Sequence, residues 1–139
     1  MHMLLTNKNA VIYGAGGSIG GAVARAFARE GAKVFLAGRT LAKLDDLAID
    51  IASAGGVAET AQVDAFDEQA VEEHVAAVVA KAGAVDIAFN AIEIKGTIQG
   101  VPLLEQSHDD ISLPVKHRVA TNFLTARAAG RHMVRKGRA

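Results

Sequence analysis

Short apolar runs alternate with longer stretches of helical periodicity along this chain of 139 residues. The apolar runs predict buried strands over residues 9–13, 34–37, 57–63 and 85–89. Apolar positions at helical spacing predict helices over 18–30, 41–51, 68–82 and about 114–136. Strands that alternate with helices are typical of successive βαβ units and a parallel sheet. Right-handed crossovers then give the strand order 3-2-1-4.

Each predicted helix has an apolar stripe that we expect to face the sheet. Thr40 and Asp67 are the expected N-caps of the second and third helices, and Gly31 and Gly83 follow the first and third. Ser107-x-x-Asp110 resembles a capping box and a helix start. The expected inward residues are Ile19, Ala22, Val23, Ala26 and Phe27, then Leu41, Leu44, Ala48 and Ile51, then Val71, Val75, Val78 and Ala82, and last Val115, Val119, Phe123, Ala126, Gly130 and Met133.

These elements predict an α/β fold class, a Rossmann-type doubly wound parallel sheet in three α/β/α layers. Half of such a sheet is accounted for, and the second half is expected to be absent from this chain. Residues 1–139 are therefore interpreted as a single domain, with residues 1–3 as a tag or a disordered start. The long connection from residue 91 to about 113, which contains Gly96, is expected to cover a ligand.

Composition narrows the function classes. Fifteen basic residues balance fifteen acidic ones, so the formal net charge is zero and the chain as a whole has no field for nucleic acid or membranes. The absence of cysteine excludes disulfides, a thiol nucleophile and cysteine-ligated zinc. The five histidines have no metal-ligand spacing, so no metal site is expected. No secretory signal pattern is present, and a cytoplasmic location is predicted.

Charge is nevertheless uneven along the chain. Up to Asp110 there are eight basic and fifteen acidic residues, whereas from Ile111 onward there are seven basic residues and no acid. We interpret Arg131, Arg135 and Lys136 as complements of the negative end of the last helix, on a solvated or subunit-facing side. Binding to nucleic acid is the less favoured interpretation.

A glycine cluster, Gly14-Ala15-Gly16-Gly17-Ser18-Ile19-Gly20, lies between the first strand and the first helix. Glycines let the backbone turn tightly and approach a diphosphate, and the helix N-terminus receives negative charge. The spacing is G-x-G-x-x-x-G, one residue longer than the common dinucleotide fingerprint. A tight turn without a ligand is the alternative interpretation.

At this cluster the chain resembles the short-chain dehydrogenase/reductase family, whose glycine motif is TGxxxGxG, and the resemblance extends from Leu4 to Ala139. Gly14, Ile19 and Gly20 match the motif, whereas Tyr13 replaces its threonine and Ser18 its middle glycine. The resemblance implies that the cofactor diphosphate lies against a set of six residues. They are Gly14, Gly16, Gly17, Ser18, Ile19 and Gly20.

The end of the second strand indicates which cofactor is used. An acidic residue there would bind the ribose 2′-hydroxyl of NAD, but this chain has Arg39-Thr40, and a guanidinium suits a 2′-phosphate. The resemblance implies NADP, with NAD as the less favoured cofactor, and Lys43 is a second candidate cation. Alternatively, Arg39 lies along the adenine or solvates the loop.

Two further strand ends align with family motifs. Asp64 and Ala65 follow the third strand, where the resemblance implies a hydrogen bond from Asp64 to the adenine amino group; a loop cap is the alternative. Asn90, Ala91 and Ile92 align with the family's NNAG and are expected on the nicotinamide side. Ile92 departs from that motif, because it replaces a glycine that lets backbone approach the ribose.

The family's proton-transfer residues are mostly not matched. Asn122 occupies the place of the catalytic Asn, with a structural amide as the alternative, but no Ser or Tyr-x-x-x-Lys follows. Tyr13 is the single tyrosine, and Gly17 stands where the lysine would be. We expect that the chain represents the N-terminal half of a longer reductase.

The resemblance implies an NADP(H)-dependent oxidoreductase that transfers hydride between nicotinamide and a small-molecule carbonyl or secondary alcohol, as a homo-oligomer (dimer or tetramer). One alternative function is a non-catalytic dinucleotide-binding module or sensor that lacks the Tyr-x-x-x-Lys site. A second is an interaction scaffold with a vestigial glycine loop.

Overall fold

A computed structural model describes residues 2–94 and 100–137 of the chain, so Met1, Gly96 and Ala139 of the predicted segments lie outside the described residues. Four parallel strands form one sheet in the order β3-β2-β1-β4, which confirms the predicted order. Their bounds are β1 Asn9–Tyr13, β2 Lys33–Gly38, β3 Val57–Gln62 and β4 Ile87–Asn90.

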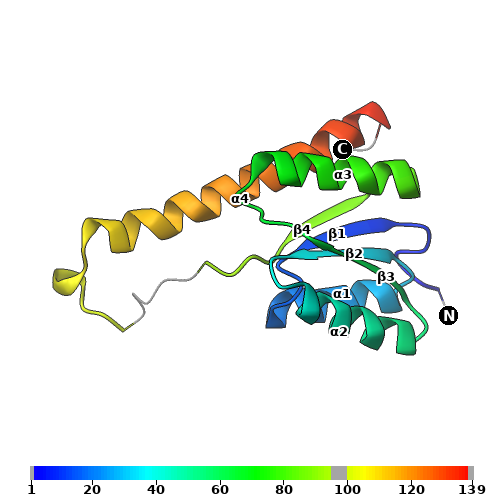
Figure 1. Ribbon diagram of the computed structural model, residues 1–139, viewed down its shortest axis with the longest axis horizontal. Coiled ribbons are helices and arrows are strands. Elements are labelled where there is room, and N and C mark those ends of the chain that lie inside the picture. The colour runs from blue at the N-terminus through cyan, green and yellow to red at the C-terminus, as the bar shows by residue number, and fades with distance from the viewer. Residues whose placement is uncertain (1, 95–99, 138–139) are drawn as a thin grey trace.

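Helices cover both faces of the sheet, as Figure 1 shows. The helices α1 (Ser18–Arg29) and α2 (Leu41–Ser53) cover one face, and α3 (Glu68–Ala82) and α4 (His108–Arg135) the other. A short 3₁₀ turn, η1, spans Leu103–Glu105. Each face buries its own apolar cluster, one including Ile12, Leu36 and Leu44 and the other Val11, Phe35 and Val75. The predicted three-layer α/β/α architecture is thus confirmed.

Strand β4 begins two residues later than predicted. Val85 is buried although it precedes the strand, and the ladder to β1 starts with the pair Ala10 and Ile87 and ends with Tyr13 and Asn90. An apolar pattern indicates which residues are buried and not which are paired in a sheet. The predicted strand therefore included Val85, which is buried but unpaired, and omitted Asn90, which is polar but paired.

The last helix begins six residues earlier than the stripe predicted. The Ser107 hydroxyl accepts from the Asp110 N–H, and the Asp110 carboxylate accepts from the Ser107 N–H, at 3.1 and 2.8 Å. This capping box confirms the helix start that Ser107-x-x-Asp110 predicted. These hydrogen bonds to Ser107 also hold the pKa of the Asp110 carboxyl below its usual value.

The predicted inward face of α4 is wrong over most of its length. Val115, Val119 and Phe123 are exposed by 60%, 62% and 56%. The buried residues of α4 are instead Thr121, Thr125, Ala128 and Ala129. They are offset from the predicted stripe by about two residues, and two residues correspond to a rotation of about 200° around the helix axis, so they lie on nearly the opposite side. Small side chains let α4 pack closely on α3 and β4, and the Thr125 hydroxyl is satisfied by the Thr121 carbonyl at 2.8 Å.

Smaller corrections apply to α1 and α2. Ile19 and Ala22 of the predicted stripe are exposed, and Gly20, Gly21 and Ala24 are the buried residues of α1. In α2 the buried residues are Leu44, Leu47 and Ile51, while Leu41 is exposed. By contrast, α3 buries Val71, Val75 and Val78 as predicted, between an Asp67 N-cap and Gly83.

The basic end of α4 pairs with acids of α3. Arg127 contacts Glu68, and Arg131 Nη1 lies 2.9 Å from Glu72 Oε1. Arg131, expected on a solvated or subunit-facing side, is half exposed and also bonds across the interface between α3 and α4. The two helices therefore lie side by side with complementary charge, as their course in Figure 1 shows.

Candidate functional site

The glycine turn, residues 14–17, lies at the carboxyl end of β1, in contact with the end of β4. Gly14 has a φ of +70°, and a Cβ built on it would lie 2.5 Å from the Ala91 carbonyl oxygen. A Cβ on Gly20 would lie 2.3 Å from the Gly14 carbonyl oxygen. These two positions require glycine, because any side chain would separate the turn from β4 or from α1.

The N-terminus of α1 opens next to this turn. Its N-cap is Gly17, which has no side chain to satisfy the helix N–H groups, and the first turn of the helix contains no acid. The first N–H groups of an α-helix lack partners within the helix, and the helix dipole places positive charge there. Backbone at Ser18, Ile19 and Gly20 is therefore suited to an anion.

Two cations line the neighbouring end of β2. Arg39 follows β2, and the Gln62 side-chain amide donates to its carbonyl oxygen at 3.0 Å. Lys43, in the first turn of α2, packs along the glycine turn, with its Cβ 3.3 Å from an ideal Cβ on Gly16. Within the described ranges neither Arg39 nor Lys43 forms an ion pair.

Thr40 occupies the N-cap position of α2 as predicted, but its hydroxyl makes no capping hydrogen bond. The expected N-cap position is thus confirmed, and the helix begins at the following residue. The Thr40 carbonyl accepts from the Lys43 N–H at 3.2 Å, so the backbone starts the helix. The Thr40 side chain instead lines the cleft described below.

Asp64 lies in the loop after β3, two residues beyond the last residue of the strand. Its Oδ1 accepts from the Phe66 N–H at 3.0 Å, so the carboxylate stabilises its own loop. Its Oδ2 has no hydrogen-bond partner among residues 2–94 and 100–137 and remains free to accept from a ligand. Phe66 packs edge-to-face against His117 of α4, with ring centroids 5.0 Å apart.

Hydrogen bonds connect the end of β4 to α4. Asn90 Oδ1 accepts from the Ile92 N–H at 2.9 Å, and Asn90 Nδ2 donates to Asn122 Oδ1 at 2.6 Å and to Thr121 Oγ1 at 3.3 Å. Asn122, predicted as a proton-relay residue, thus uses its side-chain oxygen to hold Asn90. Asn122 is itself exposed, so this contact does not make it the buried structural amide of the alternative interpretation.

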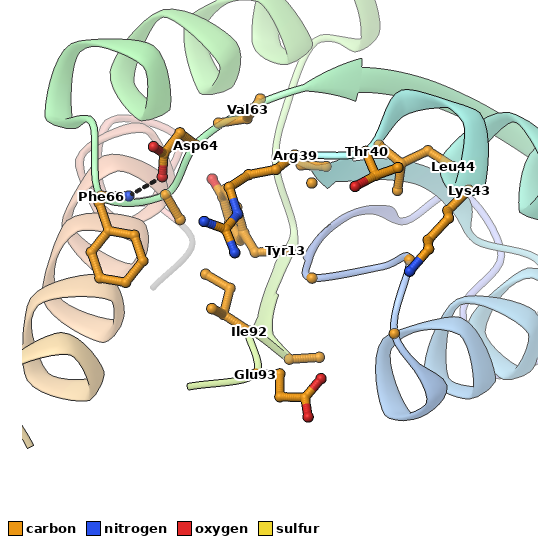
Figure 2. A pocket seen from close by; sticks show the side chains of 17 residues that line it. Tyr13, Arg39, Thr40, Lys43, Leu44, Val63, Asp64, Phe66, Ile92 and Glu93 are labelled. Atoms are coloured by element: carbon orange, nitrogen blue, oxygen red, sulfur yellow. Dashed lines mark hydrogen bonds between the residues drawn. The ribbon is translucent and has the colours of Figure 1, made fainter. Parts of the chain in front are cut away.

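A cleft of about 200 Å³ lies where these strand ends meet (Figure 2). Arg39 reaches across it toward Ile92, while Lys43 lies beside the glycine turn. The cleft brings together most of the predicted cofactor residues: Gly14, Gly16, Gly17, Arg39, Thr40, Asp64, Ala65, Ala91 and Ile92. Ser18, Ile19, Gly20, Asn90 and Asn122 are not among its lining residues.

Sequence reasoning missed Phe66 and Glu93, which also line the cleft. The sequence does contain a signal for Phe66. This aromatic residue follows Asp64 by two positions, which predicts that it lies at the carboxyl edge of the sheet beside the aspartate. Glu93 has none, because it lies in an irregular connection.

Tyr13 also lines the cleft, but it is almost fully buried beneath it. Its ring is 1% exposed and packs edge-to-face with His74 at a centroid distance of 6.5 Å, in the layer of α3 and α4. Burial and the charge of Glu72 raise the pKa of the Tyr13 phenol, so it stays protonated. In the described part of the chain, its hydroxyl has no hydrogen-bond partner.

The short chain dehydrogenase family profile matches residues 8–139. The chain belongs to this family. It is 34% identical over 134 residues to gluconate 5-dehydrogenase of Gluconobacter oxydans (strain 621H), and the match covers 96% of this chain and 51% of that protein.

Solved structures of the short-chain dehydrogenase family show the same fold. An NAD⁺-bound xylitol dehydrogenase superposes with a TM-score of 0.88 at 26% identity, covering 98% of this chain and 52% of that one. A metagenomic short-chain oxidoreductase in complex with NADP gives a TM-score of 0.81 at 29% identity, covering 97% and 60%. The chain therefore spans about half the length of the relatives it matches.

Residues 2–94 and 100–137 contain no helix with the length and apolar composition that a membrane span requires. In the same residues, no group of three or more histidine, cysteine, aspartate or glutamate side chains could hold a metal ion.

Proposed function

We propose that this chain provides the dinucleotide-binding half of an NADP(H)-dependent oxidoreductase, which transfers hydride between nicotinamide and a small carbonyl or secondary alcohol. The observation that carries the proposal is the cleft itself. It joins a helix N-terminus without an acid to Arg39 and Lys43, two cations without ion-pair partners in the described residues. Anionic groups at both the diphosphate and the 2′ position suit that charge.

The preference for NADP(H) over NAD(H) rests on the end of β2. A carboxylate here would bind the ribose hydroxyls and repel a 2′-phosphate, whereas the Arg39 guanidinium offers paired donors to phosphate oxygens. Lys43 adds a second positive charge in the first turn of α2, which also contains no acid. Similar proteins with NAD⁺ and with NADP both exist, so the proposal depends on these two residues.

The residues fit different portions of the cofactor. A cleft of about 200 Å³ is smaller than pockets that enclose whole ligands, so it suits the adenosine portion, with the rest over the open end of α1. Glycine at positions 14 and 20 lets the turn pack closely against β4 and α1, which places the N-terminus of α1 beside the cleft. The free Asp64 Oδ2 would accept from the adenine amino group. When bound, the nicotinamide supplies or takes the hydride.

A second candidate is a dinucleotide-binding module or sensor without catalysis. It is favoured by the burial of Tyr13 and by the hydrogen bond between the Asn122 side-chain oxygen and Asn90. Binding alone would then account for the cleft. A scaffold that binds no nucleotide is the remaining alternative.

Calorimetric titration of the chain with NADPH and with NADH tests the proposal. We expect binding of both cofactors with tighter binding of NADPH, and spectrophotometric oxidation of NADPH with carbonyl substrates by the enzyme that contains this chain. If neither cofactor produced a heat of binding, the proposed function would be wrong and the scaffold would be favoured. Binding without turnover against a broad carbonyl panel would favour the sensor.

We also propose a homo-oligomer in the cytoplasm. The exposed stripe Val115, Val119 and Phe123 on α4 supports the oligomer, because contiguous apolar surface of this kind marks interfaces. Sedimentation velocity of the chain and of a Val119→Lys, Phe123→Lys variant tests it. We expect the variant to shift toward the monomer, and a monomeric parent protein would contradict the proposal.

A further inference from the structure

Three polar residues of α4 face the end of β4. Arg118, Thr121 and Asn122 are spaced i, i+3 and i+4, so they lie on one side of the helix. All three contact the segment Asn90–Ile92, across 26 to 32 positions of sequence. We call these three residues the polar face of α4.

The polar face fixes the backbone of Ile92 from two directions. Arg118 Nη1 donates to the Ile92 carbonyl oxygen at 3.1 Å. The Ile92 N–H donates to Asn90 Oδ1 at 2.9 Å, and Asn90 is itself held by Asn122 at 2.6 Å. Side chains therefore satisfy both the N–H and the carbonyl group of Ile92, a residue that lies outside any strand or helix.

The segment held in this way forms one wall of the cleft. Ala91 and Ile92 line it directly, and their backbone lies so close to Gly14 that a Cβ there would be 2.5 Å from the Ala91 oxygen and 2.8 Å from the Ile92 nitrogen. The glycine turn and the Ile92 backbone are therefore in contact. A shift of Ile92 would change the position of the turn and the width of the cleft.

We propose that Arg118 is a positioning residue of the dinucleotide site, which holds the Ile92 carbonyl so that the cleft keeps its shape before the cofactor arrives. The inference rests on the proposed dinucleotide binding, but the contact itself exists without a ligand. Arg118 is exposed and does not line the cleft, so it acts through Ile92 and not by touching the cofactor.

Substitution of Arg118 tests this role. Arg118→Met removes the donor, and we expect NADPH to bind roughly three- to tenfold more weakly, the equivalent of one hydrogen bond. Arg118→Lys retains a charged donor and should recover part of that loss. Lys116→Met is the matched control. It removes the same charge from an exposed residue two positions before Arg118 that does not line the cleft, and it should bind NADPH as tightly as the parent protein does.

A second measurement distinguishes failure of this inference from failure of the proposed function. Hydrogen exchange of the Ile92 amide, followed by NMR without ligand, should be faster in Arg118→Met, while the midpoint of urea unfolding stays the same. If the parent binds no dinucleotide, the proposed function is wrong, and this exchange experiment still decides whether Arg118 holds Ile92. Unchanged exchange, or an equal loss of affinity in Lys116→Met, would overturn the inference.

Discussion

The side-chain amide of Asn90, the last residue of β4, donates a hydrogen bond of 2.6 Å to the side-chain oxygen of Asn122 on α4. This contact joins the edge strand of the sheet to α4, the longest helix in the described part of the chain, next to the residues just after β4 that line the cleft. It also orients Asn90, so that its own oxygen accepts from the Ile92 N–H. The position of α4 along the sheet therefore depends on a polar pair as well as on apolar packing.

A double-mutant cycle on this pair should show direct coupling. Asn90→Ala and Asn122→Ala are each expected to lower the free energy of unfolding, and the double variant should lose less than the sum. The coupling should be about 0.5–1.5 kcal/mol, typical of one hydrogen bond. Urea unfolding followed by circular dichroism measures it, and strictly additive effects would show that the pair does not interact in solution.

Arg39→Asp is expected to reverse the cofactor preference. The carboxylate would repel a 2′-phosphate and accept from ribose hydroxyls, so the NADPH dissociation constant should rise at least tenfold while that of NADH falls or stays constant. Calorimetry with both cofactors measures the ratio. Lys8→Asp, the same charge change on an exposed residue before β1, is the control. Unchanged affinity of Arg39→Asp for NADPH would contradict the assignment.

Gly14→Ala should destabilise the fold more than another glycine substitution at positive φ. Both Gly14 and Gly83 have positive φ, but a Cβ on Gly83 would meet nothing within 4 Å, whereas one on Gly14 would overlap Ala91. We expect Gly83→Ala to cost about 1 kcal/mol of unfolding free energy and Gly14→Ala roughly 2–3 kcal/mol. Chemical denaturation compares the two, and equal losses would mean that the contact with Ala91 is loose.

Tyr13→Phe should stabilise the protein. The buried hydroxyl has no partner among the described residues, and removing it relieves an uncompensated desolvation cost. We expect the free energy of unfolding to rise by about 1 kcal/mol, with no change in NADPH affinity. Tyr13→Leu, which also removes ring contacts with His74, should instead lower it. A loss of stability in Tyr13→Phe would indicate that the hydroxyl is hydrogen-bonded.

Stability should fall in mildly acidic solution because of His74. Burial lowers the pKa of this imidazole below its usual 6.5, so the unfolded chain binds a proton at a higher pH than the folded one does. The contribution of neutral His74 to the free energy of unfolding is therefore fully present above pH 6.5. It decreases as the pH falls toward the lowered pKa of the folded state, by at most about 1.4 kcal/mol per pH unit.

Unfolding of His74→Phe across this pH range tests the assignment. The phenyl ring retains the edge contact with Tyr13 but cannot be protonated, so the variant should lose that part of the pH dependence. His108→Phe, at an exposed site on the first turn of α4, is the matched control and should keep the profile of the parent. Identical slopes in His74→Phe and the parent would assign the effect to other groups.

Most element bounds were predictable because they depend on local periodicity, and the sheet order followed from the right-handed crossovers of βαβ units. Val71, Val75 and Val78 repeat at helical spacing and are buried as that spacing requires. The inward face of α1 was mispredicted because Gly20, which must lie against the turn, contributes nothing to an apolar pattern. On α4 the large apolar residues point outward and threonines and alanines pack inward, so the same rule selected the wrong side.

The candidate site was predictable as far as strand ends determine it. Arg39, Asp64 and Ala91 meet in one cleft because parallel strands end at a common edge. The contacts of Arg118 with Ile92 and of Asn122 with Asn90 were not predictable, since they depend on how α4 is placed and not on any local pattern. The pairing of Phe66 with His117 likewise needs the helix in position.

The contact of Gly14 with Ala91 divides the cleft into a part that can be redesigned and a part that cannot. Engineers who wish to exchange one coenzyme for another have freedom at the rim, where Arg39 and Lys43 project from the backbone. The floor offers no such freedom, since even one methyl group there would collide with the neighbouring strand end. Directed evolution of this protein should thus accumulate changes after β2 and leave the first turn untouched.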